Sequence, residues 1–153
     1  SNIGAMALSH DGRELALLWD FGPENPTRRL VHMNAANGKI LKTIEGLPPA
    51  DQGYARQHQL ADRDLFWLPE NSGWVVNLQN VVDAETGAVL PLELPVKGGA
   101  GTGDGAALSE VVEAVPAGDG RLLLIIADRP ANPDQKGTMH TQFVDLPKLG
   151  PFQ

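Results

Sequence analysis

The chain has 153 residues, the length of one ordinary domain, with 42% hydrophobic and 20% charged side chains. Nineteen acidic against twelve basic residues give a formal net charge of −7, which disfavours nucleic acid and anionic membrane surfaces as partners. The sequence has no cysteine, which excludes disulfides, thiolate nucleophiles and cysteine-ligated metals and leaves the compartment open. No apolar run approaches the length of a membrane span, and 17 glycines with 12 prolines favour short strands and turns over helices.

The chain is predicted to be one β-domain over residues 6–153, with three repeat units at about 6–46, 64–95 and 111–150. Residues 1–5 are typical of the remnant of a cleaved expression tag. In the first unit, turns at Asp11-Gly12 and Asn37-Gly38 join pairs of β-like runs, since glycine supplies the positive φ of a tight hairpin. The four predicted strands of this unit are Ala5–Ser9, Glu14–Trp19, Arg29–Met33 and Lys39–Glu45.

The second and third units repeat this arrangement. The segment Asn34–Leu41 aligns with Asp83–Leu90, 49 residues further on, with the turn glycine and the following β-branched residue in matching positions. Val144-Asp145 is the expected counterpart of Val82-Asp83 in the third unit, where prolines at 147 and 151 argue against a long fourth strand. The predicted strands are Leu65–Leu68, Trp74–Asn77, Asn80–Asp83 and Ala88–Leu94, then Val111–Pro116, Arg121–Ala127 and Thr138–Val144, which makes about eleven in all.

The turn motifs resemble a known family. Ala7-Leu8-Ser9-His10-Asp11-Gly12 before an apolar strand, and Asp83–Val89 with its Thr-Gly turn, are similar to the blade pattern of WD-repeat and quinoprotein-like β-propellers. The resemblance implies an all-β fold of tandem four-stranded antiparallel blades, a partial propeller. The usual Trp-Asp pair is replaced by Met33-Asn34 and Val82-Asp83. A β-sandwich or an open meander with the same number of strands is the alternative.

A propeller typically needs about four to eight blades to close, and one of fewer than about three leaves its two flanking sheet faces uncovered. We therefore expect a protein partner, either further copies in a homo-oligomer or adjoining blades of a longer chain. Three tryptophans on apolar strands are predicted to pack between neighbouring blades: Trp19, Trp67 and Trp74.

Binding is expected on the long connections at one end of the sheets, which are Phe21–Arg28, Gly46–Asp64, Pro95–Glu110 and Arg129–Gly137. The alternative is that these segments are only variable connections. Tyr54 beside arginine and histidine forms a possible recognition patch, or it anchors its loop. Asp104, after a glycine-rich stretch, is a possible cap for a helix over Ala106–Glu113, which competes with the strand expected from Val111. The candidate binding residues are Phe21, Arg28, Tyr54, Arg56, His58, Asp104 and Arg129.

Signals for catalysis are weak. The four histidines, at 10, 32, 58 and 140, stand singly, no serine lies in a nucleophile elbow, and no carboxylate spacing matches a calcium loop. We therefore predict no catalytic residue, no metal and no cofactor. The predicted function is a non-catalytic propeller-like scaffold or protein interaction module. The alternatives are an accessory domain of a quinoprotein-like or hydrolytic enzyme and a carbohydrate-binding β-sandwich.

Overall fold

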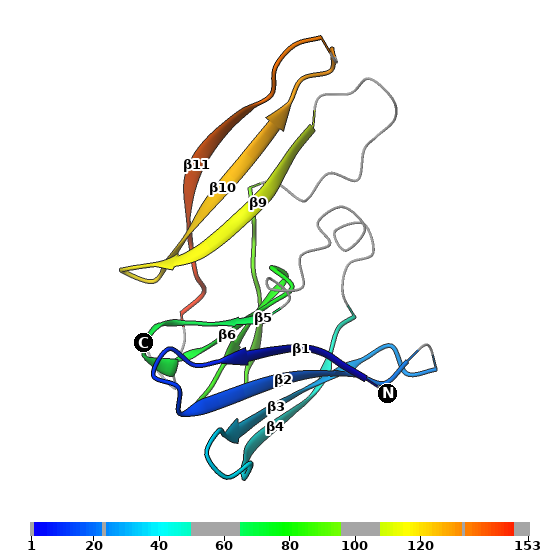
Figure 1. The fold of residues 1–153 in the computed structure, drawn as a ribbon, viewed down its shortest axis with the longest axis vertical. Coiled ribbons are helices and arrows are strands. Elements are labelled where there is room, and N and C mark those ends of the chain that lie inside the picture. The colour runs from blue at the N-terminus through cyan, green and yellow to red at the C-terminus, as the bar shows by residue number, and fades with distance from the viewer. Residues whose placement is uncertain (1, 23, 50–64, 96–107, 133, 149–153) are drawn as a thin grey trace. The chain divides into compact units, whose positions relative to one another are not determined.

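The protein is all-β in a computed structural model that describes residues 2–22, 24–49, 65–95, 108–132 and 134–148 (Figure 1). Eleven strands form three separate antiparallel sheets in these ranges, with one 3-10 turn at Pro69–Asn71 and no α-helix. None of the three sheets closes on itself. No helix in these ranges has the length and apolarity to cross a membrane.

Sheets A and B each have four strands in chain order, and sheet C has three. Sheet A contains β1 (Asn2–Leu8), β2 (Glu14–Asp20), β3 (Arg28–Asn34) and β4 (Ile40–Leu47). Sheet B contains β5 (Leu65–Trp67), β6 (Gly73–Val76), β7 (Asn80–Asp83) and β8 (Val89–Pro91). Sheet C contains β9 (Leu108–Ala117), β10 (Arg121–Arg129) and β11 (Thr138–Asp145).

The eleven observed strands correspond to the eleven predicted ones, with small differences at their ends. The strand expected over Ala88–Leu94 is only β8, three residues long. The third sheet has no fourth strand within the described chain. The sequence predicted a long connection over Pro95–Glu110 and, as an alternative, a helix over Ala106–Glu113. Both predictions are wrong from residue 108 onward, because β9 begins at Leu108 and pairs with β10 along its length. Residues 2–5 belong to β1 and pair with β2.

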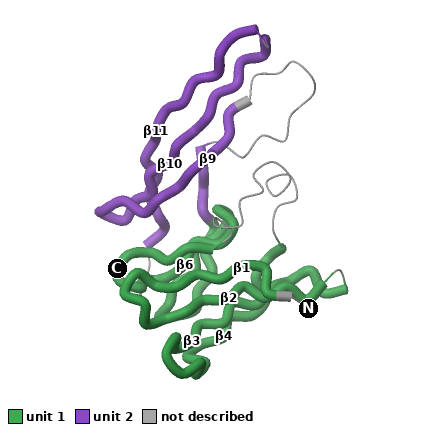
Figure 2. The backbone as a smooth tube through the Cα atoms, viewed as in Figure 1, with its two compact units in different colours: residues 1–50, 61–91, 149–153 green, residues 51–60, 92–148 purple. Residues whose placement is uncertain are grey.

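The chain divides into two compact units, residues 1–50, 61–91 and 149–153, and residues 51–60 and 92–148 (Figure 2). Sheets A and B belong to the first unit, and sheet C belongs to the second. The three repeat units inferred from the sequence therefore become three sheets in two units.

The repeat is visible in the backbone hydrogen bonds of the turns. The Gly38 N–H donates to Asn34 O at 2.9 Å, and the Gly87 N–H donates to Asp83 O at 2.8 Å, so the two aligned turns have the same geometry. A second bond, from the residue after the third strand to the residue before the second strand, recurs in all three sheets. These bonds are Ala35 N to Arg13 O, Ala84 N to Ser72 O and Leu146 N to Gly120 O, at 2.9, 3.0 and 2.8 Å.

The core of the first unit lies between sheets A and B. Leu18, Leu30 and Ile44 on sheet A pack with Trp67 and Trp74 on sheet B, and all five side chains are buried. The tryptophan rings contact each other with centroids 5.0 Å apart. Trp67 and Trp74 therefore pack between two neighbouring sheets, whereas Trp19 is half-buried and lies on the other face of sheet A.

Candidate interaction surface

Sheet A carries apolar side chains on both faces, and only one face packs against sheet B. In the register of β1, β2 and β3, inward rows alternate with outward rows. The inward rows are Ala5, Leu18, Leu30 and Ile44, and Ala7, Ala16, His32 and Lys42. The outward rows are Ile3, Trp19 and Arg29; Met6, Leu17, Val31 and Thr43; and Leu8, Leu15, Met33 and Ile40. We call these outward rows the open face of sheet A.

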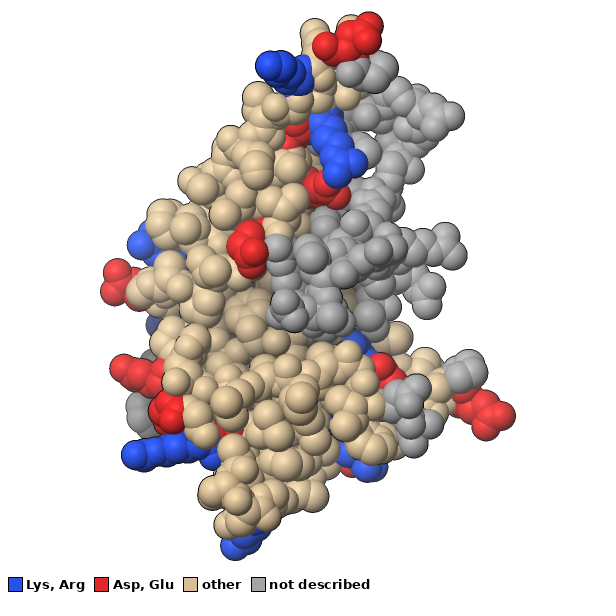
Figure 3. Space-filling view, viewed as in Figure 1, with Lys and Arg blue, Asp and Glu red and all other residues tan. Residues whose placement is uncertain are grey.

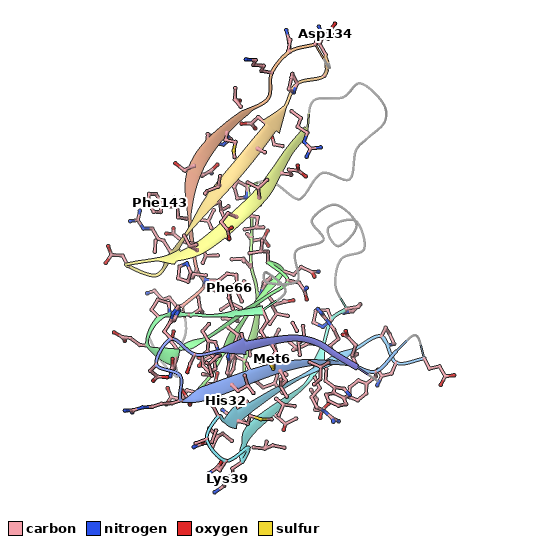
Figure 4. The ribbon with its side chains drawn as sticks, viewed as in Figure 1. Met6, His32, Lys39, Phe66, Asp134 and Phe143 are labelled. Atoms are coloured by element: carbon pink, nitrogen blue, oxygen red, sulfur yellow. The ribbon has the colours of Figure 1, made fainter. Side chains whose placement is uncertain are left out.

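The open face is most accessible along its two edge strands. On β1, Ile3, Met6 and Leu8 are 53, 65 and 57% exposed, and Ile40 on β4 is 58% exposed. Of the central residues, Leu15, Leu17, Trp19 and Met33 are half-buried, and Val31 is buried. Figure 4 shows Met6 on β1, and Figure 3 shows mostly uncharged residues over β1 and β2.

The rim of the open face carries the charges. The Arg29 guanidinium lies 4.8 Å from the centre of the Phe21 ring, and its Nε lies 2.5 Å from Glu45 Oε1. Depletion of charge at the centre with polar groups at the edge is typical of protein interfaces. Soluble monomers rarely expose a continuous apolar patch larger than a few hundred Å². The open face is therefore the strongest candidate for an interaction surface in the first unit.

A cavity of about 650 Å³ opens beside the tight turns of sheets A and B. Its lining is acidic and polar, with one histidine: Glu14, His32, Glu70, Asn71, Ser72, Asp83, Ala84 and Glu85. The sequence placed the candidate binding residues on the long connections instead. Of those that the structure describes, Phe21, Arg28 and Arg129, none lines this cavity.

His32 lines the cavity and contacts side chains from both sheets. Its Nε2 lies 2.9 Å from Glu14 Oε1, and its ring meets Trp67 and Trp74 edge-on, with centroids 5.5 and 5.1 Å away. The other oxygen of Glu14 accepts a hydrogen bond from the side chain of Asn71, in the turn between β5 and β6 of sheet B. The histidine and the carboxylate are thus engaged in joining the two sheets, which is a structural role.

Asp11 extends this network at the β1–β2 turn. Its carboxylate accepts a hydrogen bond from the Ser9 hydroxyl at 2.7 Å and one from the Arg13 N–H at 3.0 Å. These bonds favour the charged form, the Ser9 bond most strongly, and hold the pKa of Asp11 below its ordinary value of 3.8. Asn71 Nδ2 also lies 3.3 Å from Asp11 Oδ2. The turn of one sheet is therefore fixed to the turn of the other.

The cavity provides little for catalysis. The Ser72 hydroxyl donates to Pro69 O at 2.7 Å, so it is not oriented toward His32. Over the part of the chain that the structure describes, no three His, Asp or Glu side chains are grouped closely enough to hold a metal ion. The arrangement is suited to fixing two sheets together.

Three of the predicted site residues lie in the described chain, Phe21 and Arg28 in the first unit and Arg129 in the second. Arg28 is 7% exposed, and its guanidinium donates from Nε and Nη2 to Pro48 O at 3.1 and 2.9 Å, so it supports β3 and β4 from inside. Phe21 is half-buried under Arg29. In the second unit, Arg129 is exposed and pairs with Glu110 at 2.6 Å. The other candidates, Tyr54, Arg56, His58 and Asp104, lie outside the described residues.

The open face itself was missed as a set of residues, although uncovered sheet faces were expected. The sequence feature that indicates a second apolar face is the run Leu15-Ala16-Leu17-Leu18-Trp19, which is apolar at every position. A strand with one face in water alternates apolar and polar residues, whereas an unbroken apolar run indicates that both faces are to be covered.

Comparison with known proteins does not assign this chain. No protein-family model matches it, and no curated protein is similar to it.

Proposed function

We propose that this protein is a non-catalytic, propeller-like scaffold that buries the open face of sheet A against a β-sheet of a larger protein or assembly. The observation that carries the proposal is the three outward rows of sheet A, with Met6 65% exposed at the middle of its edge strand. The proposed interface is similar to the packing of sheet A on sheet B, in which the inward rows of the same strands are buried against another β-sheet.

The repeat geometry supports the propeller-like form of the proposal. Three sheets share the hydrogen bond that ties the third strand to the start of the second, as expected of one duplicated unit. Stacked repeats bury their apolar faces against their neighbours, so an apolar outer face needs a partner. The open face of sheet A is such a face. The accessory-domain and carbohydrate-binding functions remain predictions from the sequence.

The proposal is tested with Met6→Lys, which places a charge in the open face without removing a buried group. Ala36→Lys is the control, since Ala36 lies exposed in the β3–β4 turn of the same sheet. The wild-type chain should bind a hydrophobic fluorescent dye and associate at rising concentration. Met6→Lys should lower dye binding roughly twofold or more, because it interrupts the apolar patch, and leave unfolding unchanged.

Sedimentation velocity and dye fluorescence measure these effects. The control variant should behave like the wild-type chain. Equal dye binding and equal association in wild type and Met6→Lys would show that the open face does not drive interactions, and the proposed function would then be abandoned.

A further inference from the structure

The edges of the three sheets differ in how they are protected against pairing with another strand. Exposed edges invite association, and proteins usually blunt them with bulges, charges, proline or very short strands. Five of the six edges in the described chain have such a device. β1 has a bulge at Gly4, β4 has two register shifts against β3, β5 and β8 have three residues each, and β9 has a register shift and Pro116.

The sixth edge, β11, has no bulge and no proline, it is eight residues long, and its only Asp, Glu, Lys or Arg is Asp145 at the last position. Thr138–Asp145 pairs with β10 over eight consecutive residues without a register shift, and its sequence contains no proline, glycine or lysine. Seven of its eight residues are exposed, including Met139 at 63% and Phe143 at 49%. Figure 4 labels Phe143 on this strand. Sheets A and B have four strands where sheet C has three. The outer side of β11 is thus the place where a further strand would complete the pattern.

The side chains of β11 are complementary to a second copy of the same strand. Two copies related by a two-fold axis perpendicular to the sheet pair antiparallel, and only residues on the same face can be opposite each other. With the axis at Thr141, this residue faces its own copy, and Met139 faces Phe143 of the other copy on each side. On the reverse face, His140 lies opposite Gln142, and Thr138 lies opposite Val144.

The register centred on Thr141 pairs the side chains more favourably than the registers centred on the two adjacent residues. Centring the pair on His140 would place two histidines opposite each other, and centring it on Gln142 would place Met139 opposite Asp145. Cross-strand threonine pairs and contacts to an aromatic ring stabilise antiparallel pairing, whereas a carboxylate opposite methionine gains no polar partner. No charged residue lies between Thr138 and Val144 apart from the titratable His140, which is held by Asp128 at 2.5 Å.

We infer that the protein forms a homodimer by antiparallel pairing of β11 with β11 of a second copy, which joins two three-stranded sheets into one of six strands. Pairing one strand edge buries less than the roughly 1,600 Å² of a standard interface. The dimer is therefore concentration-dependent. This inference is independent of the open face of sheet A, which lies on another sheet.

The absence of cysteine allows a direct test of the register. Single cysteines are introduced into the full chain carrying Met6→Lys, so that association through the open face does not contribute. Thr141→Cys should form a disulfide-linked dimer under mild oxidation, since directly opposite residues lie within bonding reach. Gln142→Cys is the matched control and should link roughly tenfold less, because it faces residue 140 of the other copy. Met139→Cys mixed with Phe143→Cys should link, while each alone should not.

A charge swap provides a second, non-covalent measurement in the same background. Thr141→Lys alone and Thr141→Glu alone should each dimerise roughly tenfold more weakly in sedimentation velocity, because like charges meet at the axis. An equimolar mixture of the two should recover dimers. Circular dichroism checks that each variant is folded. A chain that stays monomeric at high concentration, equal linking at 141 and 142, or no recovery in the mixture would each overturn the inference.

Discussion

The indole Nε1 of Trp67 donates a hydrogen bond to the backbone carbonyl of Ala7 at 2.9 Å, and this bond ties sheet B to the edge strand of sheet A. Trp67 is almost completely buried, and its ring also contacts His32 and Trp74. The bond crosses 60 residues of sequence. It is one of the contacts that hold the two sheets of the first unit in register, together with the Asn71 bonds to the β1–β2 hairpin.

Trp67→Phe should lower the free energy of unfolding by about 1–3 kcal/mol, because it leaves the Ala7 carbonyl without its donor and removes buried ring volume. Trp19→Phe is the matched control. Trp19 is half-buried on the open face, so its replacement should cost less than about 1 kcal/mol. Urea denaturation monitored by circular dichroism measures both. Equal losses in the two variants would contradict a specific role for the Trp67 bond.

Asp11 should make stability depend on pH in the acid range. The Ser9 hydroxyl, and next the Arg13 N–H, hold its pKa below 3.8 in the folded chain. The unfolded chain therefore takes up a proton first, so the stabilisation is complete above pH 3.8 and is lost as the pH falls through the lower, folded pKa. Asp11→Asn should accordingly destabilise at neutral pH, and the difference from wild type should vanish in acid.

The cause of this shift is checked with Ser9→Ala. Removing the hydroxyl takes away the largest contribution, so the Asp11 pKa measured by carboxyl-detected NMR titration should rise toward its ordinary value. An unchanged pKa in Ser9→Ala would show that the hydrogen bond does not control the titration.

The duplicated turns predict equal sensitivity at two glycines. Gly38 and Gly87 have φ of +72° and +77°, which a residue with a Cβ adopts at a cost of about 1–2 kcal/mol. An added Cβ would meet nothing within 4 Å at Gly38 and only the Ile44 side chain, at 3.7 Å, at Gly87. Alanine at either position should therefore destabilise by a similar amount, through backbone conformation alone.

Gly118→Ala is the control for these two variants. Gly118 lies in the β9–β10 turn without a positive φ, and an added Cβ would meet nothing within 4 Å. Its replacement should be neutral or stabilise by about 0.4–1 kcal/mol, since alanine restricts the unfolded chain. Thermal unfolding compares all three variants. A loss at Gly118 as large as that at Gly38 would refute the conformational explanation.

Most of the structure that the sequence alone determined could be predicted from the residues of the turns. Asn37-Gly38 and Thr86-Gly87 specify hairpins locally, because glycine at positive φ and a polar residue bonding its own backbone need no distant partner. Between such turns, the apolar runs could be assigned to eleven strands. The dipeptides Val82-Asp83 and Val144-Asp145 were enough to align the ends of the third strands in the second and third units. The strand that begins at Leu108 was less certain, since Ala106–Glu113 also fits a helix and only pairing with β10 decides between them.

The tertiary structure decided which face of each strand is covered and which charged groups meet. Leu17 and Leu18 are adjacent and equally apolar, yet Leu18 is 1% exposed in the core while Leu17 lies on the open face. His32 stands alone in the sequence, and only the packing of two sheets brings it to Glu14, Trp67 and Trp74. Local propensity fixes turns and strands because it acts over a few residues, whereas burial and pairing between sheets depend on contacts made across the whole chain.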